Sequence, residues 1–201
     1  AYSLMSKDHA KLKFVIEQND PSLIFVDDPA PFAGALEALD LRGLPLLTST
    51  GAEGTESLAA WAENEPGPAL AGRLAGVGPD TVAKILLTSG STGTPKGVIN
   101  TQRMMVSNQV MTIFAYPFLL RRPPVIVDWL PWNHTFAGNF NFNVILFHGG
   151  TYYLDGGRPV PGRFEETLRN LREISPTLYL NVPRGYDVLV PALEAEPALR
   201  D

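Results

Sequence analysis

Short apolar runs, separated by helix-like segments, recur along the whole chain and constrain its fold more than any other feature. Runs of this kind are typical of strands buried on both faces, as in parallel sheets covered by helices. The sequence therefore predicts an α/β fold with a layered, largely parallel sheet flanked by helices. The predicted strands are residues 23–26, 44–47, 83–87, 125–130, 151–154 and 177–180.

Helical spacing or capping residues mark the segments between these runs. Helices are predicted at residues 6–19, 32–39, 58–62, 136–147, 164–174 and 186–193, and after the N-cap residue Thr101. On the helix after Thr101 we expect two buried apolar lines, formed by Val106, Val110, Ile113 and Phe114 and by Met104, Met111 and Phe118. Residues 51–79 are rich in Gly, Pro and Glu, and we expect a mobile excursion there.

Composition excludes several classes of function. The 201 residues are 45% apolar and 18% charged, as in a soluble globular protein. A net charge of −5 gives no basis for binding nucleic acid, and the most apolar stretch, residues 111–120, is too short to span a bilayer. The chain has no cysteine and three scattered histidines, so we expect no metal site. We expect a cytoplasmic protein.

A loop of ten residues, Thr88–Gly97, holds five hydroxyl side chains, three glycines and one lysine, directly after an apolar run. Backbone N–H groups at glycines, hydroxyls and an ammonium group together suit a polyphosphate. The loop is not a Walker A sequence, and Val98–Ile99 predicts a strand after it, so it joins strand to strand. The residues expected to bind the phosphates are Thr88, Ser89, Gly90, Ser91, Thr92, Gly93, Thr94, Lys96 and Gly97.

Two more loops are predicted to share one edge of the sheet with this loop. Trp132–His134 and Arg184–Gly185 each follow a predicted strand, and ligands of open α/β sheets bind outside the carboxyl ends of parallel strands. A phosphate loop beside an aromatic, histidine-bearing loop predicts a nucleotide next to a partly apolar second substrate. A lone histidine in a loop is often only structural, and that reading of His134 stays open.

Leu87–Val98 resembles the signature loop of the adenylate-forming enzymes, which include acyl- and aryl-CoA synthetases, luciferases and peptide-synthetase adenylation domains. Leu130–Gly138 resembles the next motif of that family, and Thr101–Asn108 and Asn181–Tyr186 are most similar to its feruloyl-CoA synthetase branch. The family's later motifs have no counterpart after Tyr186. The resemblance implies that the chain is an internal piece of a larger N-terminal domain.

Within that piece, the resemblance implies a single α/β segment over residues 1–201. Residues 1–50 form a lead-in of helix and strand, residues 51–79 the excursion, and residues 80–201 the region with the phosphate loop and the acyl pocket. The missing remainder of the same polypeptide would supply the other motifs.

The resemblance also implies a reaction. A carboxylic acid, such as ferulate, attacks ATP to give an acyl-adenylate, and CoA then takes the acyl group. Lys96 and His134 are the expected catalytic residues, and Mg²⁺ arrives with ATP, its ligand lying outside this segment. The expected substrate pocket consists of His134, Phe136, Asn139 and Phe140. Two alternatives remain: a phosphate-binding module without catalysis, and a structural domain whose loop binds nothing.

Overall fold

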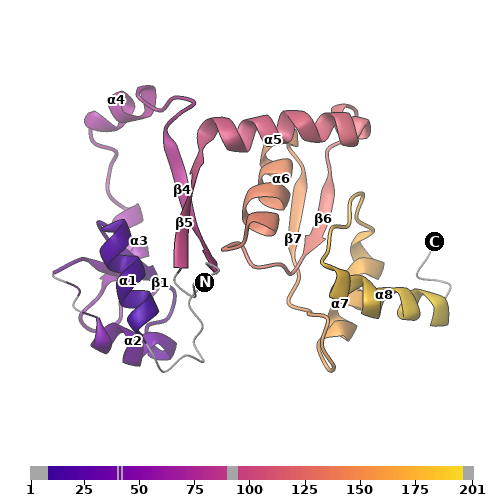
Figure 1. Ribbon diagram of the computed structural model, residues 1–201, viewed down its shortest axis with the longest axis horizontal. Coiled ribbons are helices and arrows are strands. Elements are labelled where there is room, and N and C mark those ends of the chain that lie inside the picture. Colours follow the sequence, from indigo (N-terminus) through magenta and orange to yellow (C-terminus); the bar gives the residue numbers. More distant parts are fainter. Residues whose placement is uncertain (1–8, 40, 42, 90–94, 197–201) are drawn as a thin grey trace. The chain divides into compact units, whose positions relative to one another are not determined.

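The computed structural model describes residues 9–39, 41, 43–89 and 95–196, in two compact units. The first unit is Ala1–Gly78 with Leu87–Val98, and the second is Pro79–Leu86 with Ile99–Asp201. Parallel strands and flanking helices occur in both units (Figure 1), which confirms the predicted α/β class. The described strands are distributed over three small sheets.

The sheet of the first unit consists of three short parallel strands. β1 (Ile24–Val26) pairs with β2 (Leu46–Thr48), and β2 pairs with β3 (Glu56–Ser57). Thr48 is fully buried, and its hydroxyl accepts a hydrogen bond from the N–H of Gly51 at 2.9 Å. This bond fixes the turn that leads the chain from β2 toward β3.

Helices make up the rest of the first unit: α1 (Ala10–Asn19), the 3-10 helix η1 (Ala30–Phe32), α2 (Ala33–Ala38), α3 (Leu58–Ala62) and α4 (Ala69–Ala75). α1 ends at Asp20, which adopts the left-handed conformation with φ of 42°. The segment 51–79 holds β3, α3 and α4, so it is more regular than its composition predicts.

β4 (Val82–Ser89) and β5 (Pro95–Thr101) form a two-stranded sheet. The chain therefore passes from strand to strand across residues 90–94, as the sequence predicts. Thr101 then caps α5 (Gln102–Ala115), because its hydroxyl accepts a hydrogen bond from the N–H of Met104 at 3.3 Å. The predicted start of this helix is confirmed.

The predicted buried lines of α5 are wrong. Its buried side chains are Gln109 and Thr112, whereas Met111 is 67% exposed and Phe114 is 83% exposed. Four more apolar side chains of these two lines are exposed, namely Met104, Val106, Val110 and Phe118. Apolar residues occur on several sides of α5, so the spacing alone could not tell which side faces the neighbouring helices.

The second unit is built on the parallel pair β6 (Val125–Asp128) and β7 (Thr151–Leu154), in which Val125 lies opposite Thr151. α6 (Phe142–His148) packs against β7 and α5, and α7 (Phe164–Ile174) packs against β6 (Figure 1). The side chains at the centre of this core are Ile126, Val127, Ala137 and Val144, each no more than 1% exposed.

Residues 177–180 do not form the predicted strand. The N–H groups of Thr177 and Leu178 both donate to the carbonyl oxygen of Val125, at 3.0 and 3.3 Å, and the Thr177 hydroxyl accepts from the Val125 N–H at 2.8 Å. A side chain therefore takes the place of a backbone partner beside β6. The final helix, α8 (Pro183–Ala195), begins before the predicted residue 186.

The predicted helix at 136–147 is helical throughout, but its first part is a π-helix. η3 (Phe136–Asn141) is this π-helix, and α6 continues from it to His148. Gly149 ends α6 with φ of 65°, which confirms the predicted glycine stop. π-helical turns are rare and are frequently found at functional sites.

Candidate functional site

The strands on either side of the predicted phosphate loop bring Thr88 close to Lys96. The Thr88 hydroxyl donates to the carbonyl oxygen of Lys96 at 3.5 Å. Lys96 and Gly97 lie in β5 and are exposed, so a ligand can reach the ammonium group. Ser89 ends β4. The other expected phosphate ligands, Gly90, Ser91, Thr92, Gly93 and Thr94, lie outside the described residues.

His134 lies in the exposed loop between β6 and η3. Its Nδ1 accepts a hydrogen bond from the N–H of Phe136 at 3.2 Å, and its carbonyl oxygen accepts from the N–H of Gly138 at 2.9 Å. A neutral imidazole with Nδ1 as acceptor carries its proton on Nε2. His134 thus lies just before the π-helix and can offer Nε2–H to a ligand.

Two residues from β4 and β5 hold the π-helix on its other side. The Lys84 ammonium donates to the Gly138 carbonyl oxygen at 2.8 Å, and the Asn139 amide donates to Asn100 Oδ1 at 2.9 Å. Burial lowers the pKa of Lys84 from its usual value. The Asn143 amide donates to the Asn139 carbonyl oxygen at 2.7 Å. Side chains therefore bind two backbone carbonyls of η3.

A pocket of about 260 Å³ lies between η3 and α5. It is lined by Asn100, Met104, Met105, Asn108, Thr135, Asn139 and Phe140. The structure thus brings together two of the four expected pocket residues, Asn139 and Phe140. Phe136 lies next to this wall, with its ring centroid 6.4 Å from that of Phe140, and His134 lies outside the lining.

Within the described residues, the three loops do not follow strands of one sheet. β4 pairs with β5, and β6 pairs with β7 in a separate sheet. Arg184 and Gly185 follow no strand but lie in the first turn of α8. A Cβ atom on Gly185 would lie 2.2 Å from the Asn181 side chain, so this glycine serves close packing.

Sequence reasoning missed two residues of the site, Lys84 and Asp128. Asp128 is 3% exposed and ends β6, where its carboxylate accepts hydrogen bonds from the Leu130 N–H, the Asn141 amide and the Tyr152 hydroxyl. Both residues interrupt apolar runs. A charged residue within an apolar run is the signal that could have identified them, because such a residue needs polar partners wherever it leaves water.

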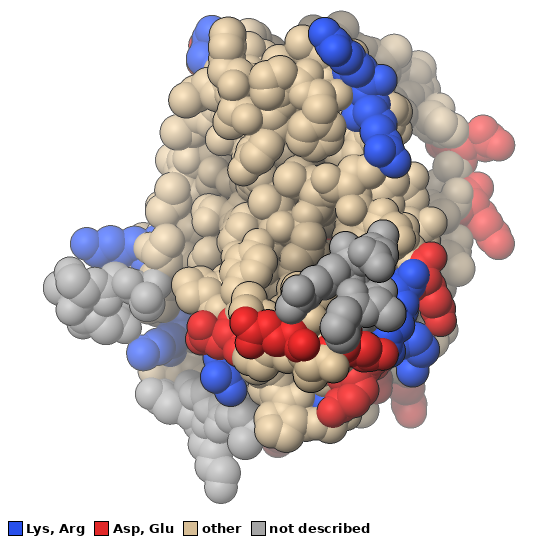
Figure 2. Space-filling model, turned by 90° about the vertical axis from the view of Figure 1, so that its right-hand side faces the viewer, with Lys and Arg blue, Asp and Glu red and all other residues tan. Residues whose placement is uncertain are grey.

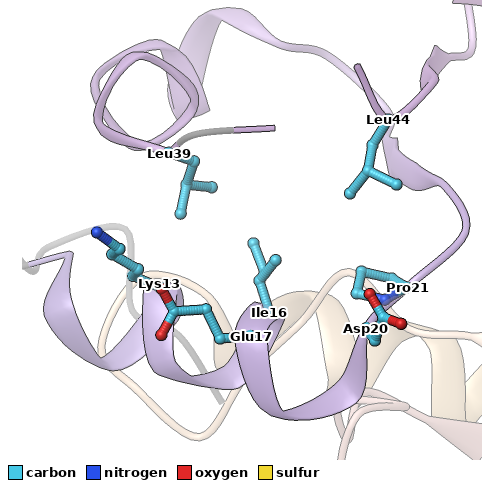
Figure 3. A pocket seen from close by; sticks show the side chains of 7 residues that line it. All are labelled: Lys13, Ile16, Glu17, Asp20, Pro21, Leu39 and Leu44. Atoms are coloured by element: carbon cyan, nitrogen blue, oxygen red, sulfur yellow. The ribbon is translucent and has the colours of Figure 1, made fainter. Parts of the chain in front are cut away.

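A larger pocket, of about 480 Å³, lies in the first unit and holds none of the expected site residues (Figure 3). Ile16 of α1 points across it toward Leu39 and Leu44, and Lys13, Glu17 and Asp20 stand at its rim (Figure 3). Its volume alone therefore does not mark the site.

Figure 2 shows one face of the molecule, on which uncharged side chains form a broad central area and basic side chains stand at separate places around it. A nucleic acid backbone needs a continuous basic surface, which this face does not offer. No three His, Asp or Glu side chains gather as a metal site within the described ranges. Among the described helices, none is long and apolar enough to cross a membrane.

Comparison with known proteins gives consistent matches. The family model of the AMP-binding enzymes matches residues 6–200. The human long-chain-fatty-acid–CoA ligase 1 is 26% identical over 193 residues, or 86% of this chain and 26% of the relative. The sulfoacetate–CoA ligase of Cupriavidus necator is 36% identical over 101 residues, or 49% of this chain and 19% of the relative.

Solved structures agree with these matches. ATP-bound MatB from Rhodopseudomonas palustris superposes with a TM-score of 0.67 at 26% identity, over 94% of this chain and 34% of MatB. McyG A-PCP, complexed with phenylalanyl-adenylate, gives a TM-score of 0.68 at 21% identity over 97% of this chain and 29% of that chain, which shows the fold alone. The chain spans about a third or less of the relatives named here.

Proposed function

The chain belongs to the AMP-binding enzyme family, and on this premise we propose that the protein activates a carboxylic acid with ATP and passes the acyl group to CoA. The single observation that carries the proposal is the connection of β4 to β5 through a Ser/Thr/Gly-rich segment, with Lys96 exposed at its end. The ligases named above join acids to CoA, and MatB binds ATP.

The proposed reaction has two steps. A carboxylate oxygen attacks the α-phosphorus of ATP, the bond to the β-phosphate oxygen breaks, and pyrophosphate leaves. The CoA sulfur then attacks the acyl carbonyl, and AMP leaves. Phosphoryl transfer depends mainly on positioning and charge neutralisation, so hydroxyls of Thr88–Thr94 and the Lys96 ammonium would hold the β- and γ-phosphates with the Mg²⁺ that ATP brings.

His134 is proposed to position the acid. A carboxylate is already ionised at pH 7 and needs no general base. The Nε2–H of His134 is free of the hydrogen bond that occupies Nδ1, so it can donate to one carboxylate oxygen. Phe136, directly after the loop, would pack beside the acyl group.

We propose an aromatic acid with a polar ring substituent, such as ferulate, as the substrate. The pocket next to η3 offers three amide side chains, from Asn100, Asn108 and Asn139, together with Met104 and Phe140. Amides can bond a ring hydroxyl or methoxyl, while thioether and phenyl groups pack on the ring. A saturated chain in the same place would form no hydrogen bonds with these amide side chains, whereas a substituted ring can.

Exchange of labelled pyrophosphate into ATP, measured with the full-length protein, tests this function. We expect exchange that depends on the acid and that falls at least tenfold in Lys96→Ala, because one charge-assisted contact to phosphate is lost. Lys11→Ala, which removes an exposed lysine of α1, is the matched control and should leave exchange unchanged. Full exchange without Lys96 contradicts the proposed role of the loop.

The acid panel decides the substrate. Ferulate, cinnamate, acetate and palmitate differ in ring, ring substituents and chain length. Higher exchange with ferulate than with cinnamate supports the amide-lined pocket, whereas higher exchange with acetate or palmitate overturns the choice of an aromatic acid. Nucleotide binding without exchange for any acid favours the second candidate, a phosphate-binding module, which the same loop supports.

A further inference from the structure

A buried carboxylate lies where β6 ends and the His134 loop begins. Asp128 is 3% exposed, and within the described ranges no lysine, arginine or histidine forms an ion pair with it. Three donors satisfy it instead: the Leu130 N–H at 2.9 Å, the Asn141 amide at 2.7 Å and the Tyr152 hydroxyl at 2.5 Å. These donors come from three elements, namely the loop, the end of η3 and β7. One side chain thus joins all three.

Tyr152 extends this connection into the loop. Its hydroxyl donates to Asp128 and accepts a hydrogen bond from Trp132 Nε1 at 3.2 Å. Burial, followed by the hydrogen bond to Asp128, raises the pKa of Tyr152 above its usual value, so the phenol stays protonated and donates. The Trp132 ring also lies against Phe142 of α6, with centroids 5.2 Å apart.

Backbone contacts hold the other side of the loop. The Trp132 carbonyl oxygen lies so close to Gly138 that a Cβ atom there would come within 2.0 Å of it. The loop is therefore fixed at Leu130 through Asp128, at Trp132 through Tyr152, and again at Trp132 through Gly138. His134 lies two residues beyond the last of these contacts.

The chemistry of the network indicates a role in positioning. A buried charge without a counter-ion is costly, and apolar residues of similar volume would often stabilise the fold as well or better. A fully satisfied polar network instead selects one arrangement of the groups that it joins. In this network those groups are the loop that carries His134 and the π-helix that carries Asn139 and Phe140.

We propose that Asp128 and Tyr152 are positioning residues, which fix loop 129–135 so that His134 and the pocket wall meet the acid in one geometry. This role rests on the proposed function. Every residue that the network joins belongs to the second unit, so we expect it to act on the acid and to leave ATP binding nearly unchanged.

Tyr152→Phe in the full-length protein tests the proposal, with Tyr153→Phe as the matched control. Both substitutions remove one phenol hydroxyl from β7, but Tyr153 is 43% exposed and lies outside the network. We expect Tyr152→Phe to raise KM for the acid about tenfold, because a hydrogen bond to a charged group is lost, and to change KM for ATP by less than about twofold. Tyr153→Phe should change neither.

A second readout separates this proposal from the proposed function. Amide hydrogen exchange should become faster in residues 129–141 of Tyr152→Phe, with other segments unchanged, and should stay at wild-type rates in Tyr153→Phe. If the wild-type protein activates no acid, the proposed function fails, and the proposed positioning role fails with it. If the wild type is active, two results with Tyr152→Phe overturn the positioning role. One is amide hydrogen exchange at the wild-type rate in residues 129–141, and the other is an equal change in KM for the acid and for ATP.

Discussion

Replacing Gly138 by alanine tests how tightly the His134 loop packs on the π-helix. A Cβ atom at this position would lie 2.0 Å from the Trp132 carbonyl oxygen and 3.0 Å from its carbonyl carbon. Ordinary contact begins at 3.4 Å, so the two segments must move apart by more than 1 Å. The obstacle is backbone, which cannot turn aside as a flexible side chain can.

Two effects of opposite sign decide the outcome. Alanine is favoured over glycine inside a helix by about 0.5–1 kcal/mol. Overpacking a well-filled site costs about 1–3 kcal/mol. We therefore expect Gly138→Ala to lower the free energy of unfolding by roughly 1–2 kcal/mol, and so to lower Tm.

Gly72→Ala in α4 is the matched control, because a Cβ atom there would meet no atom within 4 Å. In Gly72→Ala only the preference of a helix for alanine over glycine remains, so Tm should rise. Thermal unfolding of the full-length protein, followed by circular dichroism, measures both variants. Acid-dependent pyrophosphate exchange should show a raised KM for the acid in Gly138→Ala alone. If Gly138→Ala raises Tm as Gly72→Ala does, the loop is not rigidly packed and the reasoning fails.

Three further predictions concern other contacts. Gly157→Ala should lower Tm, because its Cβ would lie 2.1 Å from the Thr167 hydroxyl oxygen; an unchanged Tm would show that α7 can shift freely. Thr101→Ala should cost about 1 kcal/mol through loss of the α5 cap, measured by urea unfolding, and Thr101→Ser should restore it. Burial raises the pKa of Tyr179 from 10.0 to about 12, so its stabilising contribution is complete below pH 10 and is lost as pH rises through 12. Tyr179→Phe should make the fall in unfolding free energy over this range shallower, and an identical pH dependence would contradict the assigned burial.

Residue chemistry made part of the structure predictable. The Ser/Thr/Gly-rich segment after residues 83–87 could be placed between two strands because an apolar run precedes it and Val98–Ile99 follows it. The stop at Gly149 and the cap at Thr101 were found for the same reason, since each depends on its own conformation or side chain.

Features that depend on tertiary contacts were missed. Residues 177–180 are apolar enough for a strand, but the Thr177 hydroxyl binds the backbone of β6 instead. In the π-helix, Gly138 packs against the Trp132 carbonyl and its own carbonyl accepts from Lys84, and a local sequence pattern records neither contact. The buried face of α5 depends in the same way on the side that α6 and η3 cover.

The π-helix has a consequence for how the pocket can change. A π-helical turn holds about one residue more than an α-helical turn, so η3 amounts to a one-residue insertion ahead of α6. Each residue of an α-helix turns the chain by about 100°. Loss of one residue within η3 would therefore rotate the upstream side chains, with Phe136 among them, by about a quarter turn while α6 kept its place. A single codon gained or lost within η3 would thus change which side chains face the pocket beside it.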